Sequence, residues 1–124
     1  MHEAILVLAH GSRDPLWHLP VQAVAERIRA RAPQTAVACA YLELSTPHFA
    51  AAVDDLVAAG AGRITVLPLF FGLGRHARED LPHLLDAARQ RHPQVALLAL
   101  PAAGEHPAVL DLLADLALGL SIDR

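Results

Sequence analysis

The chain has 124 residues, of which 54% are hydrophobic and only 4% aromatic, and its formal charge is −3 with the histidines neutral. This length suits one domain, and the composition predicts a folded protein with a mainly aliphatic core. The acidic balance argues against nucleic acid as a partner, and the single cysteine, Cys39, excludes a disulfide within the chain.

The N-terminal segment MHEAILVLAH carries no basic region, and its apolar run is much shorter than the roughly 20 residues of a membrane-spanning helix. We therefore expect a soluble cytoplasmic protein with no membrane partner, in a compartment that keeps a lone thiol reduced. We expect residues 1–124 to form a single α/β domain.

Four apolar runs follow one another along the chain, and each has the composition of a strand. Continuously apolar runs of this kind are typical of strands buried on both faces of a parallel sheet. In chain order the runs are AILVLAH (4–10), AVACAYLEL (36–44), RITVLPLFF (63–71) and VALLALPA (95–102).

Amphipathic stretches separate the runs and predict four helices. Apolar residues recur at helical spacing within 21–32, 46–60, 81–88 and 109–116. The second helix is predicted to begin at Thr46 and Pro47, because a hydroxyl N-cap there precedes a proline at the first helical position. The order βαβαβαβα predicts an open, parallel, four-stranded sheet with helices on both faces, in the flavodoxin-like strand order 2-1-3-4.

Three chemically useful residues follow the first three predicted strands. His10, Glu43 and His76 come after parallel strands whose carboxyl ends meet at one edge of the sheet, so we expect them in one crevice. Two imidazoles and a carboxylate suit a divalent first-row metal ion, and a neutral imidazole can also accept a proton. The alternatives are hydrogen-bonded structural histidines and a solvated loop carboxylate.

Other kinds of site have weaker support. Glycines in HGS and FGLGRH could cradle an anion, but neither the P-loop nor the dinucleotide fingerprint is present. Ser12 lacks the GxSxG setting of a hydrolase nucleophile. His106, in GEHP, could line the crevice or begin the last helix. The remaining histidines are expected at the surface: His2, His18, His48, His83 and His92.

Four segments occur in a fixed order over nearly the whole chain: LAHGSRDP, YLEL, VLPLFFGLGRHARED followed by LP, and GEHP. Together they resemble the short branch of the class II tetrapyrrole chelatases, the CbiX-like sirohydrochlorin chelatases. The resemblance implies insertion of Co²⁺, Fe²⁺ or Ni²⁺ into sirohydrochlorin, for cobalamin, sirohaem or a related cofactor. Cobalt is our first expectation and iron our second, with the metal as substrate and no tightly bound cofactor.

The resemblance also implies roles for particular residues. His10 and His76 would be the metal-binding and catalytic histidines, and Glu43 their acidic partner, also a metal ligand. We expect five further residues to bind the carboxylate-bearing ring: Ser12, Arg13, Arg75, Arg78 and His106.

Longer relatives contain two such domains facing one another, so the resemblance implies that this chain forms a homodimer around a shared cleft. The apolar last helix, VLDLLADLALGL, could contribute to the dimer. An alternative function, from a different class, is a noncatalytic metal-binding or tetrapyrrole-carrier protein.

Overall fold

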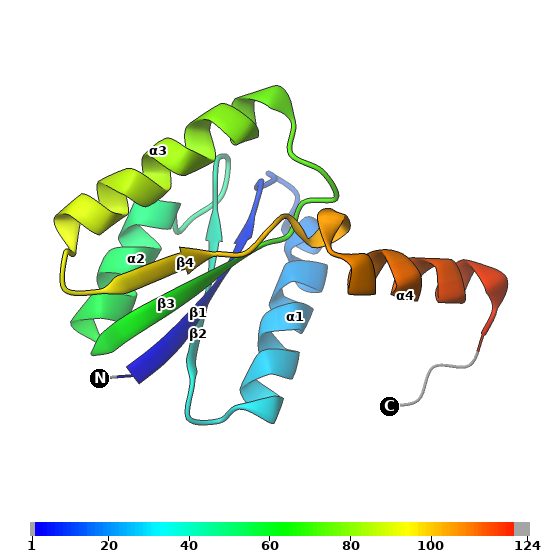
Figure 1. Ribbon diagram of the computed structural model, residues 1–124, viewed down its shortest axis with the longest axis horizontal. Helices are drawn as coiled ribbons and strands as arrows, with labels where there is room; N and C mark the ends of the chain where they lie inside the picture. Colours follow the sequence, from blue (N-terminus) through cyan, green and yellow to red (C-terminus); the bar gives the residue numbers. More distant parts are fainter. Residues whose placement is uncertain (1, 121–124) are drawn as a thin grey trace.

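Residues 2–120, which the computed structural model describes, alternate between strands and helices (Figure 1). Two short 3₁₀ helices, η1 and η2, precede α1 and α4. In chain order the elements are β1 (His2–Ala9), η1 (Pro15–Trp17), α1 (His18–Arg31), β2 (Ala36–Tyr41), α2 (Phe49–Ala58), β3 (Ala61–Pro68), α3 (Arg75–Arg91), β4 (Ala96–Ala99), η2 (Ala103–Glu105) and α4 (Pro107–Leu118).

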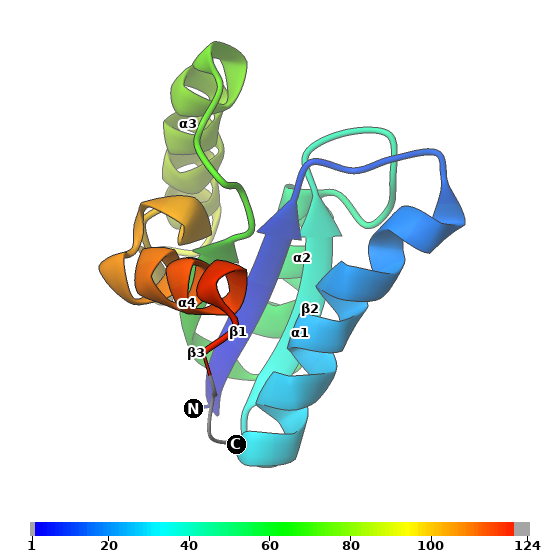
Figure 2. The same ribbon diagram turned by 90° about the vertical axis from the view of Figure 1, so that its right-hand side faces the viewer.

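The four strands form one parallel sheet in the order β2-β1-β3-β4, which confirms the predicted topology. Strands that follow one another in the sequence are joined by a helical crossover (Figures 1 and 2). All four strands therefore end at the same edge of the sheet, where the loops that carry His10, Glu43 and His76 begin.

Helices cover both faces of the sheet, as predicted. Leu6 and Leu8 of β1 belong to a large buried cluster with residues of α2 and α3, whereas Val7 and Ala9 pack with α1. All four β1 side chains are essentially inaccessible to solvent. Burial on both faces explains why this strand is a continuous apolar run without polar alternation.

The predicted start of the second helix was wrong. The helix α2 begins at Phe49 with His48 as its N-cap, and Thr46 and Pro47 remain in the preceding loop. The physical reason is that the Tyr41 N–H donates to the Pro47 carbonyl at 3.0 Å, and His48 forms a parallel bridge with Tyr41. These contacts hold the segment alongside the end of β2 and out of helical conformation.

The last helix, α4, has no buried residue and extends away from the sheet (Figures 1 and 2). The helix begins at Pro107. Its C-cap residue, Gly119, has the left-handed backbone conformation that glycine commonly adopts at the end of a helix. Within residues 2–120, no helix combines the length and apolarity needed to cross a membrane.

Candidate active site

An open cleft of about 570 Å³ lies at the carboxyl edge of the sheet. The three residues expected to carry the chemistry, His10, Glu43 and His76, all line it. The complete lining comprises His10, Leu42, Glu43, Gly74, Arg75, His76, Ala77, Asp80, His83 and Leu84. The predicted convergence of the three loops is therefore present in the structure.

His10 follows the last residue of β1, and its ring lies against the buried ring of Phe70. The two ring centroids are 4.4 Å apart and the planes are tilted by 56°. Phe70 comes from the loop after β3, so this contact joins the ends of two adjacent strands. It gives an otherwise exposed imidazole a fixed apolar support on one side.

Main-chain contacts hold the His10 and Glu43 loops together. The Glu43 N–H donates to the His10 carbonyl at 2.9 Å, which extends the pairing of β1 with β2 past the strand ends. Gly11 has φ of 111°, and a Cβ at this position would lie 1.6 Å from the Glu43 carbonyl oxygen. Only glycine permits this close approach.

Ser45 forms a second tie between the same two loops. Its hydroxyl is buried and donates to the Ser12 carbonyl at 2.8 Å, while the Ser12 N–H donates to the Ser45 Oγ at 2.9 Å. The single hydroxyl proton is thereby used, so His18 Nε2, 2.8 Å from the same oxygen, must be the donor in that contact. His18, which was expected at the surface, is instead half-buried.

Tyr41, the last residue of β2, lies beneath the His18 ring with 4.8 Å between the ring centroids. Trp17 packs near both rings. Burial raises the pKa of the Tyr41 phenol, with a smaller contribution from Cys39, so the phenol stays neutral at physiological pH. Tyr41 therefore supports the loop through packing and brings no charge to it.

Helix α3 supplies one wall of the cleft through a single face. His76 lies in its first turn, and Asp80 and His83 follow four and seven residues later, so the three share that face. His83 was expected at the surface. Its side chain is exposed, yet it lines the cleft. Helical spacing from His76 is the signal that could have found Asp80 and His83.

The three arginines expected to bind the ring are all exposed, and they lie differently with respect to the cleft. Arg75 is part of the lining and has Nε 3.5 Å from Glu79 Oε1. Arg13 and Arg78 are not among the lining residues. Their role in binding the ring stays a prediction.

Ser12 and His106 are also outside the lining, and both make local backbone contacts. The Ser12 hydroxyl accepts from the Asp14 N–H at 3.0 Å. His106 is the N-cap of α4, where its Nδ1 accepts from the Ala108 N–H at 3.1 Å. Of the two positions considered for His106, the structure shows the one that begins the last helix. Their substrate-binding roles stay predictions.

Six ionisable side chains share the cleft: three histidines, two carboxylates and one arginine. Within residues 2–120, however, no three His, Cys, Asp or Glu side chains are close enough together to hold one metal ion. His10, Glu43 and His76 thus face a common space without forming a closed ligand set. Metal binding by these three residues stays a prediction.

Comparison with known proteins connects this fold and cleft to one family. The family model described as CbiX matches residues 4–118. The chain therefore belongs to the CbiX family.

A sirohydrochlorin cobaltochelatase from Methanococcus aeolicus is 32% identical over 83 residues, which are 67% of this chain and 58% of the relative. A sirohydrochlorin ferrochelatase from Priestia megaterium is 26% identical over 122 residues, 98% of this chain and 46% of the relative. The chain thus matches less than two thirds of the length of either relative.

A crystal structure described as a putative cobalamin (vitamin B12) biosynthesis CbiX protein, from Marinobacter aquaeolei VT8, superposes with a TM-score of 0.81 at 29% identity. The match covers 94% of this chain and 95% of that one. The fold is therefore shared over almost the full length of both chains.

Proposed function

We propose that this protein is a sirohydrochlorin metal chelatase, which inserts a divalent metal ion into a metal-free tetrapyrrole. The observation that supports this most is that His10, Glu43 and His76 line one open cleft in a member of the CbiX family. The names of the two relatives support cobalt and iron as the metals to consider first. We assign the reaction to the cytoplasm, where the single Cys39 thiol stays reduced.

The overall reaction exchanges a metal ion for two protons. The aquated M²⁺ loses water, two pyrrole N–H groups lose their protons, and the four ring nitrogens become the ligands. Neutral imidazoles of His10 and His76 can bind the incoming ion or accept the pyrrole protons. Glu43 offers a carboxylate oxygen beside them.

An incomplete ligand set suits this chemistry, because the protein must release the ion to the ring. A closed set of three or four protein ligands would compete with the ring nitrogens for the metal. Separate donors around an open cleft leave coordination positions for water and for the ring. Arg75 is well placed to pair with a ring carboxylate, in exchange for its exposed contact with Glu79.

The metal order is part of the proposal. Nitrogen and carboxylate ligands bind Fe²⁺ less tightly than Co²⁺, and Co²⁺ less tightly than Ni²⁺, so the site alone does not reject a tighter-binding ion. We expect insertion of more than one metal in vitro, with cobalt first and iron second. A homodimer that closes the cleft between two copies also belongs to this proposal.

Absorbance spectroscopy tests the proposal directly. Anaerobic sirohydrochlorin is mixed with Co²⁺, Fe²⁺ or Ni²⁺ in parallel, with and without a small amount of protein, and formation of the metallated ring is followed. The proposal expects faster insertion than in buffer for at least one ion. No acceleration with any of the three would refute it. Acceleration with one ion alone would support the chelatase assignment and refute the expectation that more than one metal is inserted.

The second candidate function is a metal-binding or tetrapyrrole-carrier protein that uses the same cleft. A carrier and a chelatase are both expected to bind the metal or the ring, but only the chelatase is expected to turn over. A carrier would bind at most a stoichiometric amount of ring or metal and would leave the insertion rate unchanged once it is saturated.

A further inference from the structure

Leu44 has an unusual backbone conformation in the loop that follows β2. Within residues 2–120 it is the only non-glycine residue with a positive φ, which is 65°. The Ser45 N–H donates to the Glu43 carbonyl at 2.8 Å, so the chain makes a γ-turn centred on Leu44. A γ-turn with a positive φ at its central residue is rare and strained, and glycine or asparagine would adopt it more easily than leucine.

Contacts on both sides of the turn hold Leu44 in this conformation. Before it, the Glu43 N–H donates to the His10 carbonyl at 2.9 Å. After it, the buried Ser45 hydroxyl donates to the Ser12 carbonyl at 2.8 Å. Both contacts tie the turn to the loop after β1. Strain of this kind persists only where the surroundings fix the backbone, and it is found most often at functional sites.

The side chain of Leu44 contributes little to the folded state. It is 54% exposed, and neither buried cluster of residues 2–120 includes it. The free energy of removing its apolar surface from water is therefore left for a bound molecule. Backbone strain and an exposed apolar side chain both disfavour leucine at this position as far as folding is concerned. A role in binding explains why the two occur together.

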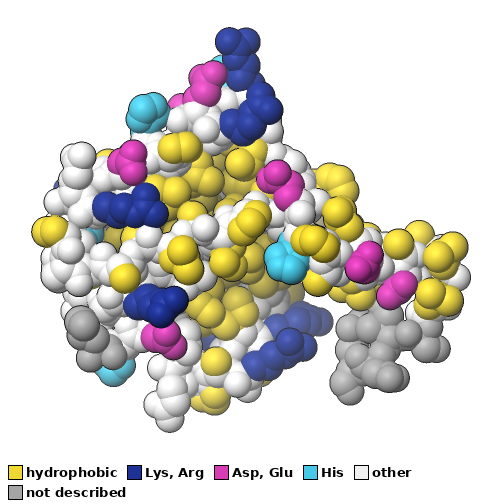
Figure 3. Space-filling model, in the orientation of Figure 1, with side chains coloured by type: hydrophobic (Ala, Val, Ile, Leu, Met, Phe, Trp, Pro, Cys, Tyr) yellow, Lys and Arg dark blue, Asp and Glu magenta, His cyan; other side chains and the backbone are white. Residues whose placement is uncertain are grey.

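Leu44 stands at the rim of the cleft, on the wall opposite α3. The two residues before it, Leu42 and Glu43, line the cleft, and α3 supplies the facing wall. Figure 2 shows the loop after β2 and the helix α3 on opposite sides of the end of β1. Charged side chains gather over the start of α3 (Figure 3). The wall that carries Leu42 and Leu44 is by contrast mainly apolar, with Glu43 as its charged residue.

A tetrapyrrole ring has two chemically different kinds of surface. Its two faces are apolar, and its edge carries the carboxylates. An apolar side chain gains most by contact with a face, whereas the edge carboxylates pair with cations or stay in water. A leucine beside Glu43 therefore suits a face of the ring, and Arg75 across the cleft suits a carboxylate at its edge.

We propose that Leu44 is a substrate-binding residue whose side chain contacts a face of the tetrapyrrole ring. The inference rests on the proposed function and adds to it a residue that determines specificity for an apolar macrocycle. The tethered turn holds the Leu44 backbone in place before the ring arrives. Binding therefore does not have to order this part of the loop, which reduces its entropic cost.

Two substitutions of Leu44 separate ring binding from folding. Leu44→Asn keeps a side chain of similar size, tolerates a positive φ and removes the apolar surface. We expect it to unfold at a urea concentration equal to or higher than that of the wild type, because the strain is relieved, and to bind metal-free sirohydrochlorin about tenfold more weakly. Leu44→Met keeps the apolar surface and should bind the ring about as tightly as the wild type.

Fluorescence titration of the metal-free ring gives its dissociation constant, and insertion kinetics with Co²⁺ give KM and kcat. We expect Leu44→Asn to raise KM for the ring about tenfold and to leave kcat nearly unchanged, since the cleft histidines are intact. Leu98→Asn is the matched control, at a 46% exposed leucine of β4 that lies outside the cleft lining. It should bind the ring like the wild type.

Three results would overturn the inference. The first is unchanged ring binding by Leu44→Asn. The second is equal weakening by Leu44→Asn and Leu44→Met, because the apolar surface would then not be what the ring contacts. The third comes from sedimentation velocity on the same samples. Weaker association of two copies in Leu44→Asn, with an unchanged ring dissociation constant, would place Leu44 between protein chains instead of against the ring.

The wild-type measurements keep this inference distinct from the proposed function. A wild type that binds the ring, weakens as described in Leu44→Asn and inserts no metal would refute the chelatase and support the Leu44 contact. A wild type that inserts metal, with Leu44→Asn equal to it in ring dissociation constant and KM, would refute the contact and support the chelatase.

Discussion

Gly11 controls how closely the loops of His10 and Glu43 approach. An alanine Cβ would overlap the Glu43 carbonyl, and a φ of 111° is strained for any residue with a side chain. We expect Gly11→Ala to lower the free energy of unfolding by about 1–3 kcal/mol and the insertion rate by about tenfold or more. Urea unfolding and the absorbance assay measure the two effects.

Gly72 is the matched control for this substitution. It lies in the loop before α3, and a Cβ there would have no neighbour within 4 Å. Gly72→Ala should leave both stability and rate close to those of the wild type. Equal effects of the two substitutions would show that the close approach of the loops is unimportant.

His10 and His76 are exposed at the cleft, so removing either imidazole should affect chemistry more than folding. We expect His10→Ala and His76→Ala each to lower the insertion rate by about 100-fold or more, with the free energy of unfolding nearly unchanged. His48→Ala, at an exposed histidine whose side chain does not cap α2, is the control. Near-normal turnover in His76→Ala would remove that residue from the mechanism.

Glu43→Gln keeps the size of the side chain and removes its charge. The Glu43 N–H still bonds to the His10 carbonyl, so the loop should keep its shape. We expect a slower insertion rate with unchanged circular dichroism. A rate equal to that of the wild type would show that the carboxylate is only a solvated loop residue.

The residues at the cleft were predictable to the extent that they follow strands. His10, Glu43 and His76 each come after a recognisable apolar run, and parallel topology brings such positions to one edge. Ser45 and His18 were not predictable in this way. Their contact depends on how two irregular loops fold over one another, for which no periodic pattern exists in the sequence.

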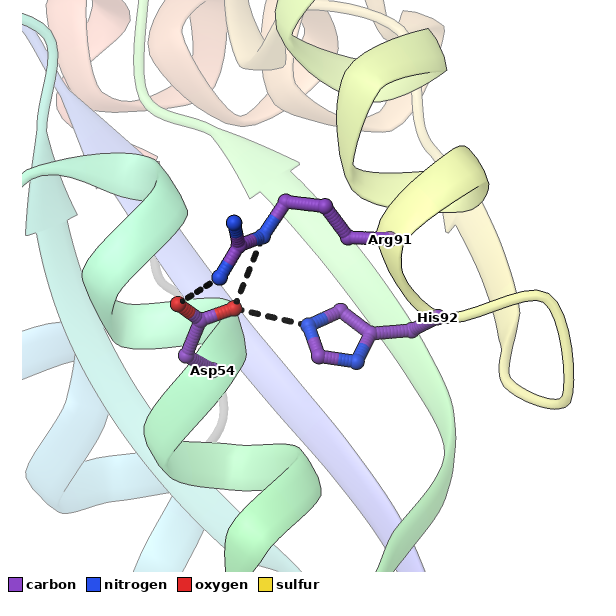
Figure 4. A network of polar contacts seen from close by, with 3 residues as sticks. All are labelled: Asp54, Arg91 and His92. Atoms are coloured by element: carbon purple, nitrogen blue, oxygen red, sulfur yellow. Dashed lines mark hydrogen bonds and ion pairs between the residues drawn. The ribbon is translucent and has the colours of Figure 1, made fainter.

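Asp54 links α2 to the end of α3 (Figure 4). Its carboxylate accepts from His92 Nε2 at 2.7 Å and from Arg91 at 2.6 Å. The hydrogen bond from His92 is the main cause that lowers the pKa of Asp54, and the bond from Arg91 adds to it. The contact therefore favours the ionised carboxylate.

This lowered pKa predicts a pH dependence of stability. The contribution of Asp54 is fully present above its unfolded-state pKa of about 3.9, and it is lost as the pH falls through the lower folded-state pKa. Since the pair is partly exposed, solvent screening limits the contribution to about 1 kcal/mol or less. Asp54→Asn should thus be less stable than the wild type near pH 7, and the difference should disappear in strong acid.

Urea unfolding of both proteins across this pH range provides the measurement. Asp55→Asn, at the next and more exposed position of α2, is the matched control and should show no such convergence. A wild-type advantage over Asp54→Asn that persists unchanged in strong acid would contradict the assignment.

Helix boundaries show where local patterns stop being sufficient. The spacing of Leu81, Leu84, Leu85 and Ala88 marked the third helix, yet α3 begins six residues earlier, at Arg75. Its first turn is polar and lines the cleft, so it carries no apolar signal. The start of α2 was misplaced for a different reason, because pairing with β2 overrides the preference of a Thr-Pro pair for a helix start.

The order of the sheet followed from general rules of chain connection. Alternating strands and helices with right-handed crossovers leave few topologies, and the order β2-β1-β3-β4 is one of them. The direction of α4 did not follow from such rules. It depends on the tertiary contact of Gly104 with the loop after β3, which no local pattern in the sequence reveals.

Counting products per protein molecule tests the central claim, that the cleft is a catalytic metal-insertion site. Wild-type protein is mixed anaerobically with about a hundredfold excess of sirohydrochlorin and Co²⁺, next to His10→Ala and a protein-free sample, and the metallated ring is measured by its absorbance. We predict many rings per wild-type chain, formed faster than in buffer, and a His10→Ala rate close to that of buffer. Product that stops at about one ring per chain, or a wild-type rate equal to that of buffer, would contradict the claim.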